Sequence, residues 1–266
     1  MEATSATTPV PDRLRPLRYL WRVPLLLLLV VFGILLCALV LTWSHGVMKN
    51  GKEPFGHRTI RFWSNLLLRI FGFRSRRFGT PLVDPVLFVA NHTSWLDIET
   101  LHTQRAACFV AKAEIARWPL VGWMAAQGGT IFHRRGSNHS LASVMQVMVQ
   151  RMNDGRSVAV FPAGGTGYGG VLRVFHARIF QAALDANVPV QPVALRYARD
   201  GKRLIDAGFR EGESFMGNFI RLLGEAPMDA EVHFLEPVPA MPDARRRMAE
   251  SAREKIRIAL DTDRPV

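Results

Sequence analysis

The sequence predicts an α/β fold preceded by an apolar helical segment. From about Arg76 onward, short apolar stretches with strand character alternate with stretches of helical periodicity, the pattern typical of α/β proteins. Before that point, an apolar run of 21 residues from Val23 to Trp43 is long enough to cross the hydrocarbon core of a bilayer. At 266 residues the chain can bury one core plus an accessory segment. We therefore expect membrane-anchoring helices over residues 1–75 and an α/β domain over residues 76–266.

The elements expected within the α/β part are short. Apolar runs rich in β-branched and aromatic residues, bounded by turn residues, predict strands over Val86–Ala90, Cys108–Ala111, Thr130–Phe132, Ser157–Phe161, Val190–Arg196 and Glu231–Phe234. Helical spacing of apolar residues predicts helices over Leu96–Gln104, Leu120–Ala126, Ser140–Met152 and His176–Ala186. The mixed segment Asp200–Gly224 is expected to hold a surface helix, and the arginine-rich tail Asp243–Asp261 a solvated terminal helix.

The apolar run Val23–Trp43 predicts a membrane anchor. Trp21 and Trp43 bracket the run as interfacial anchors do, and it follows Arg13, Arg15, Arg18 and Arg22. A signal peptide is the alternative, but the run is long and lacks a convincing cleavage site of small residues. We therefore expect the segment to be retained and to hold the protein at a membrane.

The charges leave the orientation of this anchor open. Basic residues flank the apolar run on both sides, so the bias that orients a single span is weak. In the next segment, Thr59–Phe73, apolar residues fall at helical spacing with Arg61 and Arg69 among them. This helix either lies in the membrane interface, forming a hairpin in one leaflet with the first helix, or belongs to the core of the following domain.

The chain is strongly basic, with 34 Lys and Arg against 22 Asp and Glu and a net charge of +12. This balance predicts an anionic partner such as a membrane surface or a phosphorylated lipid. Nucleic acid is disfavoured because the arginines are dispersed rather than clustered with exposed aromatic residues. Cys37 and Cys108 alone imply no disulfide framework, and the histidines lack metal-ligand spacing, so we predict no metal site.

The most informative stretch is Phe88–Asp97, which places His92 and Asp97 five positions apart after an apolar strand. On one continuous helix these two side chains would point roughly 140° apart, since each residue turns the helix by about 100°. If the strand ends at Asn91 and a helix begins near Trp95, the turn between them brings the pair together. One ring nitrogen of His92 would then take a proton from an alcohol while Asp97 holds the other nitrogen. The pattern predicts a His–Asp dyad without a protein nucleophile.

The same stretch resembles the N-H-x4-D motif of the glycerolipid acyltransferases, the family that acylates glycerol 3-phosphate and lysophospholipids. Three further blocks follow in that family's order. Gly129–Arg135 resembles its G-x-[IL]-[FL]-x-x-R element, Val158–Gly167 its F-P-E-G-T block, and Val188–Leu195 its V-P-[IV]-x-P-[VI] strand. The resemblance covers about Val83 to Tyr197. It implies a mixed sheet flanked by helices, with His92 and Asp97 as the catalytic residues.

The resemblance also implies positive groups near a substrate phosphate. Arg135 stands in the family's arginine position, and guanidinium groups grip phosphate through paired, charge-assisted hydrogen bonds. Lys112 lies in a segment that resembles the one between the family's first two blocks, and would add positive charge near the same phosphate.

The third block departs from the family pattern. Ala163 stands where the family has glutamate, and a methyl group accepts no hydrogen bond. The glycine-rich loop that follows still presents backbone N–H groups to an anion, so we expect substrate contacts from Gly164, Gly165 and Thr166. Either acceptor handling has changed, activity is low, or the protein no longer catalyses.

Taken together, the resemblance implies a membrane-bound acyltransferase of phospholipid biosynthesis, on the cytoplasmic face of a bacterial inner membrane and without a cofactor. Acyl-CoA or acyl-carrier protein would donate the acyl group to a lysophospholipid such as 1-acyl-sn-glycerol 3-phosphate. Two alternatives stay open. Residues Thr166–His176 look more like relatives that acylate lyso-ornithine lipid, an acceptor without phosphate, and Ala163 suits a non-catalytic lipid-binding homologue.

Overall fold

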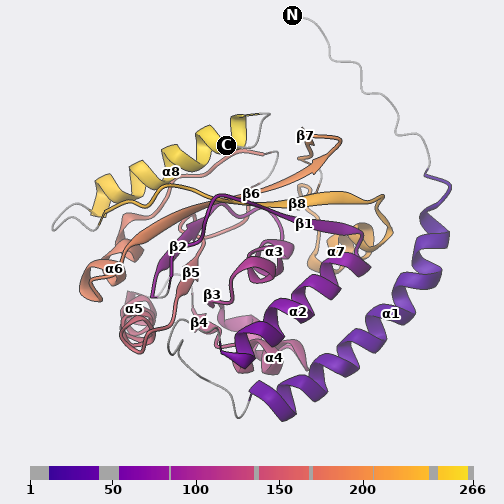
Figure 1. Cartoon of the computed structure of the whole chain (residues 1–266), viewed down its shortest axis with the longest axis horizontal. Helices are drawn as coiled ribbons and strands as arrows, with labels where there is room; N and C mark the ends of the chain where they lie inside the picture. Colours follow the sequence, from indigo (N-terminus) through magenta and orange to yellow (C-terminus); the bar gives the residue numbers. More distant parts are fainter. Residues whose placement is uncertain are drawn as a thin grey trace, which may run out of the picture.

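A computed structural model describes residues 12–41, 54–83, 85–134, 138–167, 170–205, 207–239 and 245–262 (Figure 1). Over these ranges the chain forms a mixed α/β structure in which one sheet lies between two groups of helices. The predicted fold class is confirmed.

The sheet contains eight strands in the described part of the chain. Their order is β1-β8-β6-β2-β5-β3-β4, and β7 pairs with the end of β6. Neighbouring strands are parallel except that β6 runs antiparallel to both β8 and β7. The strands are β1 (Phe73–Phe78), β2 (Leu87–Ala90), β3 (Cys108–Lys112), β4 (Ile131–His133), β5 (Val158–Val160), β6 (Val190–Arg199), β7 (Lys202–Arg203) and β8 (Met228–Phe234).

The helices divide between the two faces of this sheet (Figure 1). One core contains residues of α5 (Asn138–Asn153), α6 (Gln181–Asp185) and α8 (Arg245–Asp261). The opposite face is covered by α2 (Phe55–Ile70), α3 (Leu96–Gln104) and α7 (Phe215–Gly224). The remaining helical elements are α1 (Arg15–Leu36), its π-helical extension η1 (Cys37–Leu41), η2 (Ala113–Arg117), α4 (Val121–Gln127) and η3 (Ala177–Phe180).

The middle strand β2 is buried on both faces, which explains why its sequence is apolar throughout. Leu87 and Val89 point into the core formed with α5, α6 and α8. Phe88 and Ala90 point to the other side, into the core that includes Leu101 of α3. This alternation fixes the direction in which the chain leaves the strand.

Helix α1 lies along the outside of α2 (Figure 1). The indole nitrogen of Trp63 on α2 donates to the carbonyl of Leu29 at 3.2 Å. One turn further along α1, Gly33 passes so close that a Cβ at this position would lie 2.5 Å from the same indole nitrogen. The two helices therefore pack directly, with a glycine at their crossing point.

The first turns of α1 are fastened to the carboxyl end of α7. Arg15, Arg18 and Arg22 donate to the carbonyls of Arg221, Gly224 and Leu223 at 3.3, 3.0 and 2.9 Å. Cationic side chains are favoured at the carboxyl end of a helix, where the backbone dipole places partial negative charge. The sequence analysis treated these arginines only as charges that flank a span, whereas they bind the α/β unit.

In the described part of the chain, one helical stretch, Arg15–Leu39, is long and apolar enough to cross a membrane. Its outward apolar side chains are exposed, including Leu17, Leu20, Leu27, Leu28, Val31 and Leu35. A core helix of this composition would be mostly buried, so the exposed face indicates membrane association. Helix α2, in contrast, buries Leu67 and Leu68 in the α/β core, as expected for the second of the two alternatives for that segment.

Most predicted strands and helices are confirmed, with ends that differ by three residues or fewer. Strand β1 was missed because three arginines interrupt its alternation, and it crosses the boundary expected at residue 76. Strand β7 was missed because it has only two residues. The solvated terminal helix was half wrong, since Met248, Ala252 and Ile256 of α8 lie in the core. Whether the chain divides into an anchor and a catalytic domain at that boundary stays a prediction.

Candidate active site

A buried asparagine fixes the turn at the carboxyl end of β2. Asn91 donates from Nδ2 to the carbonyl of Leu195 and accepts from the N–H of Leu195, both at 2.8 Å. Since Leu195 belongs to β6, the side chain extends the pairing of β2 with β6 by one residue after the strand has ended. The chain then leaves the sheet, and α3 begins at Leu96 as predicted.

The turn brings His92 and Asp97 into contact. Nδ1 of His92 lies 2.9 Å from Oδ2 of Asp97, and the two side chains are 14% and 0% exposed. A carboxylate accepts hydrogen bonds, so the proton of the neutral imidazole is assigned to Nδ1 and the lone pair to Nε2. No hydrogen-bond partner of Nε2 occurs among the described residues. The geometry therefore leaves a basic nitrogen free beside the surface.

Four donors hold the Asp97 carboxylate in place. Oδ2 accepts from the N–H groups of Thr93 and Ser94 at 2.6 and 2.8 Å as well as from His92. Oδ1 accepts from the hydroxyl of Tyr197 at 2.7 Å. These bonds stabilise the charge of a buried carboxylate and prevent its rotation, so His92 is oriented through a fixed partner.

The Tyr197 hydroxyl acts as a donor at the pH of the cell. Its burial and the neighbouring charge of Asp97 raise the pKa of Tyr197 well above the ordinary value for a phenol. Tyr197 stands on β6, and its ring packs edge-to-face on Phe73 of β1 with centroids 5.6 Å apart. The sequence analysis did not select this residue because it lies 100 positions from Asp97.

The segment after β5 holds the other side of His92. The Phe161 ring stacks on the imidazole, with centroids 3.9 Å apart and planes 9° from parallel. Further along, the N–H of Gly167 donates to the carbonyl of His92 at 2.7 Å. A Cβ at Gly167 would come within 2.6 Å of the Val171 carbonyl oxygen, so only glycine allows this approach. Ring stacking and a backbone bond together fix the glycine-rich loop to the dyad.

A small hollow opens beside His92. Its walls come from the turn after β2, the glycine-rich loop, β7 and the last turn of α8. The lining residues are Asn91, His92, Thr93, Ala163, Gly165, Gly167, Gly170, Val171, Leu172, Arg173, Arg203 and Leu260. The carboxyl ends of the adjacent parallel strands β2 and β5 thus lead into one concave site, the usual place for ligands in α/β sheets.

The three predicted loop residues, Gly164, Gly165 and Thr166, differ in whether they line the hollow. Gly165 lines the hollow together with His92 and Ala163. Gly164 has a φ of 68° and is exposed, and its own N–H donates to the Phe161 carbonyl. Thr166 is half-buried and does not line the hollow. Ala163 is 6% exposed and also packs in the core, so its methyl group closes the hollow from below.

Of the two predicted cationic residues, only Lys112 lies in the described structure, and it is not brought to the hollow. Lys112 ends β3, is exposed, and is absent from the lining. Arg135 lies outside the described residues. The arginines that do line the hollow are Arg173 and Arg203. The sequence analysis missed both arginines, because Arg203 follows the last recognised block and Arg173 lies in a stretch read only as a resemblance.

The fold and the dyad identify the class of protein. A family model described as Acyltransferase matches residues 78–196, which include the dyad and the glycine-rich loop. A lyso-ornithine lipid O-acyltransferase of Pseudomonas aeruginosa is 37% identical over 244 residues, covering 92% of this chain and 94% of that protein. The chain belongs to the acyltransferase family and is an acyltransferase of the lysophospholipid type.

Other relatives agree with this assignment. A second lyso-ornithine lipid O-acyltransferase, from Brucella abortus, is 30% identical and matches 81% of this chain. A 1-acyl-sn-glycerol-3-phosphate acyltransferase of Neisseria gonorrhoeae is 40% identical over 119 residues, 44% of this chain and 47% of that protein. The crystal structure of the 1-acyl-sn-glycerophosphate acyltransferase of Thermotoga maritima has a TM-score of 0.64 over 92% of this chain, at 17% identity, and supports the fold.

Proposed function

We propose that this protein transfers a fatty acyl group from a thioester to the free hydroxyl of a lyso-ornithine lipid. The observation that carries the chemistry is the His92–Asp97 pair, in which Nδ1 of His92 is held by Asp97 and His92 lines a hollow at the carboxyl ends of β2 and β5. The observation that favours this acceptor is the similarity to lyso-ornithine lipid acyltransferases over most of the chain, whereas the neisserial glycerophosphate relative matches less than half of it.

In the proposed reaction His92 acts as general base. Nε2 takes the proton from the acceptor hydroxyl as its oxygen attacks the thioester carbonyl carbon. The C–S bond then breaks, and the protonated imidazole returns the proton to the leaving thiolate. The new O–C bond makes an ester and releases a thiol, so no covalent acyl-enzyme forms. Asp97 stabilises the positive charge that develops on the ring and keeps the proton on Nδ1.

Ala163, which stands where the family has glutamate, fits an acyl acceptor other than a glycerophosphate. The family places a glutamate here, and in this chain a buried methyl group and backbone groups of glycines occupy that part of the hollow. A loop without the carboxylate removes a hydrogen-bond acceptor for a glycerol hydroxyl. Similarity over 92% of the chain to a protein named as an acyltransferase supports an active enzyme over a non-catalytic lipid binder.

The acyl donor and the location belong to the same proposal. Acyl-CoA and acyl-carrier protein are cytosolic thioesters, so either donor requires the hollow to face the cytoplasm. The exposed apolar face of α1 would hold the protein at the bacterial inner membrane. The second acceptor candidate is 1-acyl-sn-glycerol 3-phosphate, favoured by the 40% identity to the neisserial enzyme over 119 residues.

The test is acceptor-dependent thiol release by the detergent-purified full chain. Palmitoyl-CoA and a palmitoyl thioester of acyl-carrier protein are each offered with lyso-ornithine lipid or with 1-acyl-sn-glycerol 3-phosphate. We expect release with lyso-ornithine lipid, and a loss of about 100-fold to 10,000-fold in His92→Ala, because a general base supplies rate enhancements of that order. The matched control is His102→Gln, since His102 lies on α3 outside the hollow and bonds the Ala107 carbonyl.

The outcomes separate the alternatives. Release with the glycerophosphate alone would move the acceptor to the second candidate. No release with any pair, in protein that still binds lysolipid, would favour the non-catalytic binder. Wild-type rates in His92→Ala would refute the role of the dyad.

A further inference from the structure

Arg203 brings a positive charge to the hollow. It stands on β7, in the short hairpin that follows β6, and pairs with Ala198 in the ladder. Its guanidinium donates to the carbonyls of Leu260 and Gly170, in each case at 3.3 Å. Both distances are at the long end for N–H···O bonds, and the acceptors are neutral. These contacts position the guanidinium at the hollow without neutralising its charge.

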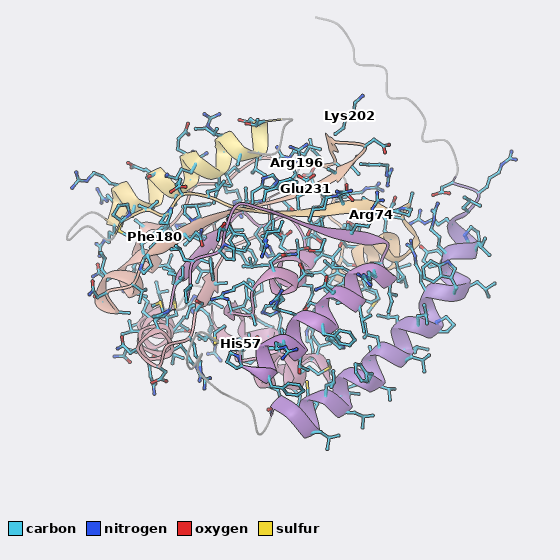
Figure 2. The ribbon with its side chains drawn as sticks, in the orientation of Figure 1. His57, Arg74, Phe180, Arg196, Lys202 and Glu231 are labelled. Carbon is cyan, nitrogen blue, oxygen red and sulfur yellow. The ribbon has the colours of Figure 1, made fainter. Side chains whose placement is uncertain are left out.

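No ion pair of Arg203 with a carboxylate occurs among the described residues. Arg196 and Arg221 show the contrast. Arg196 lies 3.5 Å from the Glu231 carboxylate (Figure 2), and Arg221 lies 2.7 Å from that of Glu213. Burial lowers the pKa of Arg203, more than the nearby charge of Asp261 raises it. A half-buried cation that is not bonded directly to a carboxylate gains more from a bound anion than a solvated one does.

The other residues that line the hollow also favour a negatively charged ligand. Its lining contains no Asp or Glu in the described chain, and it contains a second arginine, Arg173. Gly165, Gly167 and Gly170 leave backbone rather than side chains on one wall. The only basic nitrogen there that serves the proposed reaction is Nε2 of His92. The hollow is thus built to take a negatively charged group close to the dyad.

We propose that Arg203, with Arg173 beside it, binds the anionic head group of the acyl acceptor and so places the acceptor hydroxyl at His92. This inference rests on the proposed function and extends it to the head group. The planar guanidinium presents paired N–H donors that match a carboxylate or a phosphate. Ornithine that is acylated through an amine keeps its carboxylate, and 1-acyl-sn-glycerol 3-phosphate carries a phosphate. Either acceptor therefore offers the required anion.

The first experiment measures KM and kcat of the full chain for acceptor and donor in the wild type, Arg203→Gln and the control Lys202→Gln. Lys202 is the neighbour of Arg203 on β7, but its side chain points away from the domain (Figure 2) and is not part of the lining. Arg203→Gln should raise the acceptor KM by about tenfold to a hundredfold, as expected for a lost hydrogen bond to a charged group. The donor KM should stay unchanged, and Lys202→Gln should match the wild type.

Arg203 also holds two carbonyls, so a general loosening of the fold has to be separated from lost binding. Arg173→Gln provides the separation, because Arg173 is exposed and its side chain makes no hydrogen bond in the described chain. It should raise the acceptor KM in the same direction without lowering the unfolding temperature. Equal loss of rate for all substrates in Arg203→Gln, with no effect of Arg173→Gln, would overturn the proposal and leave Arg203 a structural role.

The second experiment distinguishes the two anions by binding without turnover. Dissociation constants are measured in the His92→Ala background for lyso-ornithine lipid, its methyl ester, 1-acyl-sn-glycerol 3-phosphate and neutral monoacylglycerol. If Arg203 holds the carboxylate, the methyl ester should bind about tenfold or more weakly than the free acid, and Arg203→Gln should abolish that difference. A preference for phosphate over monoacylglycerol that disappears in Arg203→Gln would assign the phosphate instead.

The binding measurement also keeps the two proposals apart. Anion-dependent binding through Arg203 without any thiol release would refute the proposed function and leave this inference standing. Thiol release in which acid and ester behave alike, and phosphate and monoacylglycerol behave alike, would support the enzyme and overturn the role of Arg203.

Discussion

The hydroxyl of Tyr197 provides a direct test of how the dyad is held. Tyr197→Phe removes the donor to Oδ1 of Asp97, 2.7 Å away, and keeps the ring that packs on Phe73. Because the apolar burial is unchanged, the cost of the substitution is the hydrogen bond alone. A hydrogen bond to a charged group contributes about 1.5–3 kcal/mol. We expect the free energy of unfolding to fall by that amount.

Turnover should respond much less than stability. Asp97 keeps its contact with His92 and its bonds from Thr93 and Ser94, so the imidazole stays oriented. We expect the rate of thiol release to fall by no more than about tenfold, which corresponds to roughly 1.4 kcal/mol in the activation barrier. Asp97→Asn removes the charge itself and should cost about 100-fold or more in rate.

The assay is urea unfolding of detergent-solubilised protein followed by circular dichroism, with thiol release measured on the same preparations. Tyr19→Phe is the matched control, because the Tyr19 hydroxyl accepts from Nε of Arg15 at 3.2 Å but donates only to a neutral group, the exposed carbonyl of Ile220, at 2.9 Å. Such a bond contributes about 0.5–1.5 kcal/mol. If Tyr197→Phe unfolds at the same urea concentration as Tyr19→Phe, the bond to Asp97 contributes no more to the free energy of unfolding than the bond of Tyr19, and the reasoning is refuted.

Two further predictions concern Ala163 in the hollow and the ion pair between Glu213 and Arg221. Ala163→Glu should raise the KM for an anionic acceptor by about tenfold, because a carboxylate in the lining would pair with the guanidinium that binds the head group. The control is Ala163→Gln, which adds a side chain of equal size without charge. The difference in KM between the two variants measures the effect of the charge. Glu213 accepts hydrogen bonds from Arg221, which lower the pKa of its carboxyl from 4.5 to about 2. Its stabilisation is therefore complete above pH 4.5 and is lost as pH falls toward 2, so the difference in unfolding temperature between wild type and Glu213→Gln should shrink over that range.

Each of these predictions has a clear contrary outcome. A higher turnover in Ala163→Glu would mean that the site still uses the family's glutamate and that the anion-binding account is wrong. A difference between wild type and Glu213→Gln that stays constant from neutral pH down to about pH 3 would show that the ion pair with Arg221 does not stabilise α7 through its charge.

Local sequence was sufficient for the elements whose signal is contained in the element. The apolar run Val86–Ala90 predicted β2, and the spacing of Leu96–Gln104 predicted α3 correctly. Strand β1 failed because its pairing with β8, 155 residues further on in the register of Phe73 with Met228, gives the strand its stability. Its three arginines carry no local signal for a strand.

The same division holds for the candidate site. His92 and Asp97 were found because both lie in one stretch of ten residues, Phe88–Asp97. The contact of their side chains follows from where the strand ends and where the helix begins. Arg135 and Lys112 were inferred from a family pattern, and their contact with substrate stays a prediction. Tyr197 and Arg203 come from strands that reach the dyad only through the sheet, so no spacing in the sequence marks them.

The sequence by itself determined the fold class, the apolar N-terminal helix and the contact between His92 and Asp97, because hydrophobic periodicity and short-range geometry act over a few residues. The tertiary structure alone decided which charges serve which purpose. Arg15, Arg18 and Arg22 look like topology signals and bind the end of α7, whereas Arg203 looks like an ordinary surface arginine and lines the hollow. A charge acts through what lies within a few ångströms of it, and only the folded chain sets those distances.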